Sequence, residues 1–147
     1  MILNLISNAI KFTPSGGIVS IMCKKILSAL DLTYSDDVAM QEIVSKSNYG
    51  MLEIIVKDTG VGIQEENLNK LFKLFGFLDA TKELNTSGIG LGLHICKMIV
   101  EQFGGMITCK SKWKEGTSFI FLIALDDSED TAQDKNLRCR NPMKKVY

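Results

Sequence analysis

The chain has 147 residues, of which 46% are hydrophobic and 23% are charged, and its formal net charge is zero. These values predict one soluble globular domain with one core, and they argue against nucleic-acid binding, which usually needs a basic face. The longest apolar run, 119–125, is too short to cross a membrane. The four cysteines are scattered and none stands at ligand spacing from the single histidine, His94, so we expect reduced thiols and no zinc site.

Apolar periodicity divides the first half of the chain into a helix and two strands. The helix is expected to carry Asn4, Asn8 and Lys11 along one polar stripe, opposite an apolar side, and Pro14 should end it. The predicted elements are a helix over 1–13, strands over 18–27 and 51–57, and between the strands a loop over 28–50 that contains a short helix near 38–44.

The second half of the chain is predicted to contain two helices and a β-hairpin. A stretch between the two helices has few apolar anchors, which is typical of a lid, and the chain becomes polar after the hairpin. The predicted elements are a helix over 65–74, a mobile lid over 76–87, a helix over 91–103, hairpin strands over 106–110 and 117–125, and a disordered tail over 126–147.

One candidate site stands at the end of the strand over 51–57. Asp58 follows that apolar strand and precedes Gly60 and Gly62, so its carboxylate could accept a hydrogen bond from an exocyclic amine while the glycines allow close approach. An ordinary Asp-Thr-Gly turn explains the same residues. The polar stripe on the first helix is equally open, because it could bind a polar ligand or simply face water.

A glycine triplet at 88, 90 and 92 stands at the start of the helix over 91–103. A helix N-terminus offers unpaired N–H groups and a partial positive charge, which suit phosphate. The triplet is not a Walker A motif, because no Gly-Lys-Ser/Thr occurs. It is not the dinucleotide fingerprint either, because Leu93 stands where that fingerprint needs glycine. A phosphate site here would be of another kind.

Taken together and in this order, the motifs resemble the ATP-binding domain of sensor histidine kinases over roughly residues 1–125. The matching motifs are Asn-x-x-x-Asn-Ala-x-Lys-Phe-Thr at 4–13, Asp-x-Gly-x-Gly at 58–62, Leu-Phe-x-x-Phe at 71–75 and Gly-x-Gly-x-Gly at 88–92. The resemblance implies an α/β fold of the Bergerat type, an α+β two-layer sandwich with helices on one face of a mixed β-sheet. Relatives carry a further strand and helix before the asparagine helix, so we expect a domain that is incomplete at its N-terminus.

The resemblance also implies roles for individual residues. Asn8 would ligate Mg²⁺ through its amide oxygen, with Asn4 near the metal or the phosphates and Lys11 on a phosphate. Asp58 would accept the amine of adenine, whereas Phe72 would anchor the lid or pack in the core. The predicted ATP-binding set is Asn4, Asn8, Lys11, Asp58, Gly60, Gly62, Ile63, Phe72, Phe75, Gly88, Gly90, Leu91, Gly92 and Thr117, with no catalytic residue in the chain itself.

By the same resemblance the chain is the ATP-binding part of a protein histidine kinase. It would donate the γ-phosphate of ATP to a histidine on a separate dimerisation hairpin, upstream of a response-regulator receiver domain. Relatives that hydrolyse ATP carry a glutamate at the position of Asn4, and an amide cannot take a proton from water, which favours transfer over hydrolysis. His94 is expected to be a packing residue and not the phosphoacceptor.

We expect a cytoplasmic segment without membrane contact, from a parent protein that could itself be membrane-anchored. Two alternatives stay open: a non-catalytic remnant that binds nucleotide or another protein, and an ATPase of the same superfamily.

Overall fold

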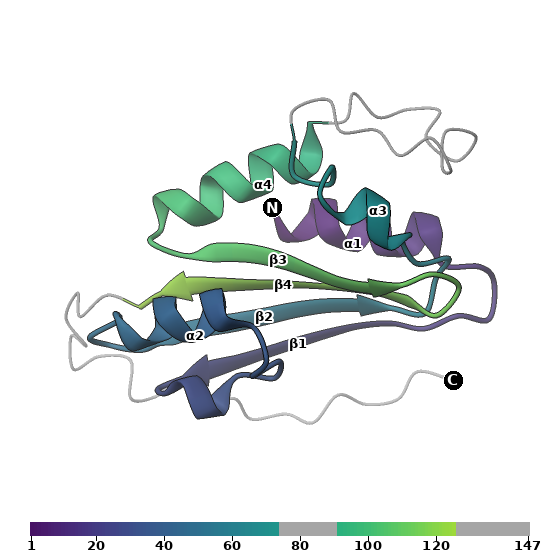
Figure 1. Ribbon diagram of the computed structural model, residues 1–147. Helices are drawn as coiled ribbons and strands as arrows, with labels where there is room; N and C mark the ends of the chain where they lie inside the picture. The colour runs from purple at the N-terminus through teal and green to yellow at the C-terminus, as the bar shows by residue number, and fades with distance from the viewer. Residues whose placement is uncertain (74–90, 126–147) are drawn as a thin grey trace, which may run out of the picture.

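The computed structural model describes residues 1–73 and 91–125, which form one sheet with helices packed against it (Figure 1). The strands of the described residues belong to a single four-stranded sheet, in the order β1-β2-β4-β3. In chain order, the elements are α1 (Ile2–Phe12), β1 (Val19–Ile26), the 3₁₀ turn η1 (Ala29–Asp31), α2 (Val38–Ser45), β2 (Met51–Asp58), α3 (Glu65–Leu68), α4 (Gly92–Gln102), β3 (Met106–Lys112) and β4 (Gly116–Ala124).

Neighbouring strands in the described part of the chain are all antiparallel. The α/β fold class is confirmed, but the expected mixed sheet is not found among these strands. β2 and β3 do run in the same direction, because each is antiparallel to β4. They are not neighbours, since β4 lies between them, and so the connection through α4 creates no parallel pair.

One face of the sheet packs against α1 and α4. Alternate residues of the two central strands, such as Val56 of β2 and Phe121 of β4, point to this face because side chains alternate along a strand. They pack with Leu5 of α1 and with Cys96 and Val100 of α4, all of which are buried. This first core holds α1 against the end of the sheet where the candidate residues lie.

The remaining residues of the same strands form a second core on the opposite face. Ile55 and Ile120 pack there with Met40 and Val44 of α2, which lies on the other side of the sheet from α1 and α4 (Figure 1). The expectation of helices on one face is therefore wrong. The segment 28–50, expected to be mostly loop, folds into η1 and α2 and covers the second face.

A buried carboxylate fastens this cover to the sheet. Glu53 of β2 is only 1% exposed, and its two carboxylate oxygens accept hydrogen bonds from the backbone N–H of Thr33, at 3.2 Å, and from the Thr33 hydroxyl, at 2.6 Å. The ammonium group of Lys24 lies 3.4 Å from the same carboxylate. Three donors therefore offset the cost of burying the charge.

The predicted boundaries are close for most elements and wrong for one. The helix expected over 65–74 is a single α-helical turn, α3, followed by tight turns in which N–H groups bond to the carbonyl three residues back, as from Lys70 to Asn67. The hairpin strands are also displaced, because β3 extends to Lys112 and β4 begins at Gly116. The predicted lid over 76–87 and the tail over 126–147 lie outside the described residues.

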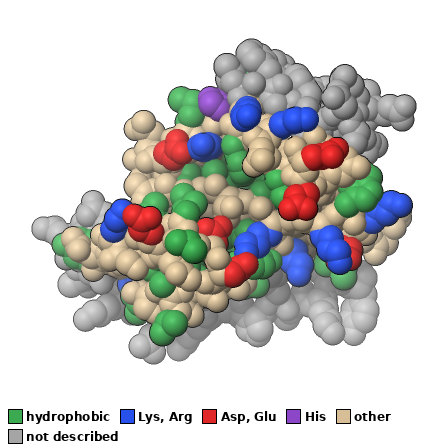
Figure 2. Space-filling view, in the orientation of Figure 1, with side chains coloured by type: hydrophobic (Ala, Val, Ile, Leu, Met, Phe, Trp, Pro, Cys, Tyr) green, Lys and Arg blue, Asp and Glu red, His purple; other side chains and the backbone are tan. Residues whose placement is uncertain are grey.

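Charged side chains of both signs are mixed on the face of the molecule that carries α2 (Figure 2). The described residues of this face thus offer no broad basic surface, and the absence of nucleic-acid binding stays a prediction. No helix within 1–73 or 91–125 is long and apolar enough to cross a membrane.

Candidate nucleotide-binding site

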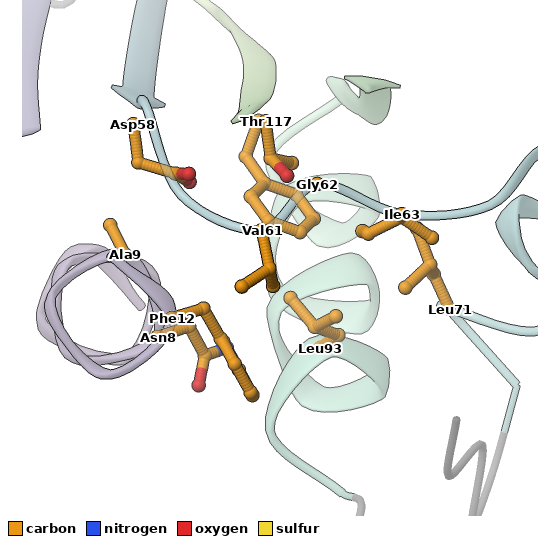
Figure 3. Close-up of a pocket in the computed structure, with 11 residues that line it drawn as sticks. Asn8, Ala9, Phe12, Asp58, Val61, Gly62, Ile63, Leu71, Leu93 and Thr117 are labelled. Carbon is orange, nitrogen blue, oxygen red and sulfur yellow. The ribbon is translucent and has the colours of Figure 1, made fainter. Parts of the chain in front are cut away.

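A small cavity opens between α1, the start of α4 and the adjoining ends of β2 and β4 (Figure 3). Its volume of about 70 Å³ is below the roughly 300 Å³ of typical small-molecule pockets, so it can enclose only part of a nucleotide. Most of its lining is apolar, with three polar side chains, which suits a flat aromatic base with a polar edge. The lining residues are Asn8, Ala9, Phe12, Asp58, Val61, Gly62, Ile63, Leu71, Leu93, Thr117 and Phe119.

Asp58 is the charged group of this cavity. It is the last residue of β2 and is 5% exposed, and its carboxylate accepts a hydrogen bond from the backbone N–H of Gly60 at 2.8 Å. Burial raises the pKa of the Asp58 carboxyl, while the backbone N–H groups of Gly60 and Thr117 partly oppose that rise. A buried carboxylate with spare acceptor capacity favours a ligand that brings hydrogen-bond donors.

The loop after Asp58 is held against the rest of the protein by its own backbone. The N–H of Val61 donates to the carbonyl of Phe12 at 3.1 Å, and the N–H of Lys114 donates to the carbonyl of Val61 at 2.8 Å. A Cβ atom on Gly60 would overlap the Phe12 carbonyl oxygen. Gly62 has a φ of +66°, and a Cβ there would overlap the carbonyl oxygen of Lys112.

The close contacts of Gly60 and Gly62 explain why glycine is needed at both positions, which the sequence alone did not show. The two glycines let the loop approach the end of α1 on one side and the β3–β4 turn on the other. The expected role, room for adenine, stays a prediction, although Gly62 does line the cavity.

The three polar residues along one side of α1 have different surroundings in the structure. Asn8 lines the cavity, and among the described residues its side chain has no hydrogen-bond partner. Asn4 instead packs on α4: its amide nitrogen lies 3.6 Å from the sulfur of Cys96, and a Cβ on Gly92 would come within 2.6 Å of its amide oxygen. Lys11 lies at the exposed end of the helix with its ammonium 5.3 Å from the centre of the Phe12 ring.

The apolar side of α1 is also less complete than the periodicity indicates. Leu5 and Ala9 are buried, but Ile10 is 64% exposed and Ile2 is 38% exposed. Helical spacing alone does not distinguish a residue that faces the sheet from its neighbour one position around the helix.

Thr117 lies beside Asp58 because the two residues are paired in the register of β4 and β2. It is 7% exposed, and its hydroxyl lies 3.0 Å from that of Ser111, its neighbour on β3. The Ser111 hydroxyl also accepts a hydrogen bond from the backbone N–H of Ile63 at 2.8 Å. Ser111 is absent from the predicted set, because only the register of three strands brings it to this place.

Other predicted residues lie near the cavity or beyond the described chain. Phe72 is packed edge-to-face on Phe119, with ring centres 6.4 Å apart, and Leu91 is the residue before α4. His94 is half-buried, with its Nδ1 atom 3.1 Å from the carbonyl oxygen of Phe72, as a packing residue would be. Phe75, Gly88 and Gly90 lie outside the described residues.

The apolar lining was largely missed by the sequence analysis. Ala9, Phe12, Val61, Leu71, Leu93 and Phe119 line the cavity but are not in the predicted set. In the sequence these residues look like ordinary core positions, and nothing in periodicity separates a side chain that lines a cavity from one that fills a core.

The described side chains could supply only some of the ligands of a metal ion. Within the described residues no group of three or more His, Cys, Asp or Glu side chains could hold a metal ion. Mg²⁺ bound with a nucleotide needs few protein ligands, because phosphate oxygens and water supply the others. The amide oxygen of Asn8 is a hard ligand of the required type at the edge of the cavity.

Comparison with known proteins points to one family. Residues 1–127 match the sequence profile described as histidine kinase-, DNA gyrase B-, and HSP90-like ATPase. Sensor protein SrrB of Staphylococcus aureus is 38% identical to this chain over 117 residues, which cover 80% of this chain but only 16% of that protein. The chain thus spans a small part of the curated relatives that it matches.

Solved structures share the fold. The catalytic domain of histidine kinase ThkA is 29% identical, with a TM-score of 0.56 over 83% of this chain and 63% of that one. The mycobacterial sensor histidine kinase MprB, at 24% identity, has a TM-score of 0.58 over 84% of this chain and 66% of that one. Full-length ShkA, solved in complex with AMPPNP, has a TM-score of 0.58 at 24% identity and covers 85% of this chain and 21% of that one.

The profile match spans the elements that line the cavity, from α1 to β4, and the ThkA structure at 29% identity is itself described as the catalytic domain of a histidine kinase. This chain therefore belongs to the histidine kinase-, DNA gyrase B- and HSP90-like ATPase family, as a catalytic ATP-binding domain of the kind found in sensor histidine kinases.

Proposed function

We propose that this domain binds Mg-ATP with the adenine base in the cavity beside Asp58, and that it donates the γ-phosphate to a histidine on a separate dimerisation hairpin. The observation that carries the proposal is the buried Asp58 carboxylate in the lining of an apolar cavity that Asn8 also lines. A base with an exocyclic amine would supply the donor that the carboxylate lacks, and its ring would contact the apolar lining.

The binding half of this proposal is tested by calorimetry with Mg-ADP. We expect the Asp58→Asn and Asn8→Ala variants to bind roughly tenfold to a hundredfold more weakly, because a hydrogen bond to a charged group contributes about 1.5–3 kcal/mol. Asp36→Asn is the matched control, since Asp36 is exposed and pairs with Lys110 on the opposite face of the sheet. Unchanged affinity in both site variants would refute the assignment of the site.

Asn8 is the proposed metal ligand, and Lys11 the proposed phosphate contact. When bound, Mg²⁺ would neutralise charge on the transferring phosphates and orient them. Asn8 would hold the metal side of the nucleotide at the wall of α1, while Lys11 would add a positive charge at the end of that helix. The glycines at 88, 90 and 92 stay candidates for phosphate contacts.

Transfer is favoured over hydrolysis by the residue at position 4. Asn4 has no basic group, and in the structure its amide lies against α4, where it contacts Cys96 and Gly92. It therefore does not present a base to water. We expect no appreciable release of inorganic phosphate from ATP by this chain alone, but formation of a phosphohistidine when a hairpin bearing an acceptor histidine is added.

Two other functions make different predictions. An ATPase would release phosphate without an acceptor and would lose that activity on substitution of Asn4. A non-catalytic remnant that only pairs with another protein would show no rise in melting temperature with Mg-ADP, whereas a remnant that binds nucleotide would show that rise but form no phosphohistidine. By analogy with sensor kinases, the proposed partners are the acceptor hairpin and, downstream, a receiver domain, in a cytoplasmic setting.

A further inference from the structure

The hydroxyl of Ser111 has three polar neighbours, although Ser111 does not line the cavity. Its hydroxyl accepts a hydrogen bond from the backbone N–H of Ile63 at 2.8 Å and lies 2.9 Å from the carbonyl oxygen of Gly116 and 3.0 Å from the hydroxyl of Thr117. Ile63 and Thr117 both line the cavity, one from the loop after β2 and the other from β4. Ser111 thus connects two walls of the cavity through a single oxygen atom.

The protons of this cluster can be assigned. A serine hydroxyl has one proton and two lone pairs, and a backbone carbonyl can only accept. The Ser111 proton therefore goes to the Gly116 carbonyl. One lone pair of Ser111 takes the N–H of Ile63, and the other takes the proton of the Thr117 hydroxyl.

The consequence concerns Thr117, whose side chain lines the cavity. With its own proton directed at Ser111, the Thr117 oxygen presents lone pairs toward the cavity. Thr117 and Asp58 are cross-strand neighbours, so two acceptors stand side by side on the sheet. Such an edge matches a base that carries an amine and mismatches a base that carries an oxo group at the same position.

We propose that Ser111 is a positioning residue that fixes the Thr117 hydroxyl as a hydrogen-bond acceptor and holds the Ile63 loop against it, and that it thereby contributes to the selection of adenine. The inference rests on the proposed function, because it assigns the base of the nucleotide to this cavity. It adds a residue on β3 that touches no ligand and acts through Thr117 and Ile63.

The test compares two nucleotides that differ at one position of the base. Calorimetry on the full 147-residue chain measures the affinities for Mg-ADP and for Mg-IDP, whose hypoxanthine carries an oxo group in place of the amine. The wild type should prefer ADP. In Ser111→Ala we expect the ratio of the two affinities to shrink roughly threefold to tenfold, the size of one neutral hydrogen bond.

The ratio of the affinities for Mg-ADP and Mg-IDP distinguishes a positioning role of Ser111 from a purely structural one. A purely structural role would weaken the binding of both nucleotides equally and leave this ratio unchanged, and that result would overturn the inference. Ser111→Thr keeps the hydroxyl on a strand where β-branched residues are favoured, so it should restore the ratio. Ser20→Ala, an exposed serine on β1, is the matched control and should leave the ratio unchanged.

A second variant keeps the inference open to refutation if Ser111→Ala does not fold. Thr117→Val preserves the shape of the side chain and removes its hydroxyl, so it should reduce the ratio by a similar factor; an unchanged ratio there would also overturn the inference. If the wild type binds neither nucleotide, the proposed function fails and this inference fails with it. If the wild type binds ADP but the ratio does not respond to Ser111, only this inference fails.

Discussion

At the scale of single residues, the geometry of the cavity depends on glycines that lie in close contact with another segment of the chain. Gly60 lies against the carbonyl of Phe12, at the end of α1, and Gly92 lies against the side chain of Asn4. Both are glycines of the recognised motifs, but their neighbours differ in how far they can move. A carbonyl at the end of a helix is fixed, whereas a side-chain amide can change rotamer.

This difference predicts unequal costs for the same substitution. We expect Gly60→Ala to lower the free energy of unfolding by about 1–3 kcal/mol, as overpacking against fixed atoms does. Gly92→Ala should be close to neutral, because Asn4 can change rotamer and alanine loses less conformational entropy than glycine on folding. Urea denaturation of the two variants checks the order, and an equal loss in both would contradict it.

The ionisation of Asp58 predicts opposite pH dependences for folding and for binding. Burial raises its pKa above the ordinary value of 3.8, so the folded chain holds this proton more tightly than the unfolded chain. As pH falls from neutral through the raised pKa, the Asp58 contribution to the free energy of unfolding must therefore increase. Nucleotide affinity should decrease over the same range, because a protonated carboxyl loses acceptor capacity.

Paired measurements on wild type and Asp58→Asn isolate this group. Urea denaturation without ligand and calorimetry with Mg-ADP should each show a pH-dependent part in the wild type that the variant lacks. If both quantities fall together on acidification, and do so equally in the variant, Asp58 is not the group responsible.

At the scale of elements, the second face of the sheet is built by the segment that the sequence described least well. α2 packs its buried side onto β2 and β4, and Glu53 of β2 receives two hydrogen bonds from Thr33. The sequence analysis predicts a short helix near 38–44 in this segment but no role for it. The apolar side chains of that helix become a cover because they meet the side of β2 and β4 that faces away from α1 and α4.

The bond between Thr33 and Glu53 should be important for stability and irrelevant to the nucleotide. In Thr33→Val the buried carboxylate loses its closest donor, and we expect the free energy of unfolding to fall by about 1.5–3 kcal/mol. Thr33→Ser keeps the donor and is the matched control. Affinity for Mg-ADP should stay unchanged in both variants, because the cavity lies on the opposite face; a loss confined to binding would contradict this division.

How much the sequence predicts also depends on scale. β2 and β4 are recognisable because alternation is a local property, and the start of α4 is marked by its glycines. The length of α3 cannot be recognised from the sequence, because turns with hydrogen bonds from residue i+3 to residue i keep the same apolar spacing as an α-helix. Strand order and the position of Ser111 depend on contacts between residues far apart in the chain, and no local pattern records them.

At the scale of the whole molecule, β1 is an edge strand of the described sheet. Ile21 is 53% exposed and Met22 is 50% exposed, and within the described residues β1 pairs only with β2. An apolar edge strand with free backbone groups is a template for pairing with another chain. We therefore expect the exposed edge of β1 to contact another chain.

We expect the isolated chain to self-associate as its concentration rises, and Ile21→Lys to reduce that association, because a charged residue on an edge strand disfavours pairing. Sedimentation velocity over a concentration series checks both points. Leu30→Lys is the control, since Leu30 is 91% exposed but lies on η1 and not on the strand. Association that responds to Leu30 and not to Ile21 would place the contact elsewhere.

The central position of β2 and β4 has a consequence for hydrogen exchange. Each of these strands is paired on both sides and covered on both faces, so their amides should exchange only when the whole domain unfolds. Asp58 is the last residue of β2 and Thr117 is the second residue of β4, whereas Asn8 lies on a helix that packs against one face. Partial opening of the domain should therefore separate the α1 wall first and leave the two acceptors in register on the sheet.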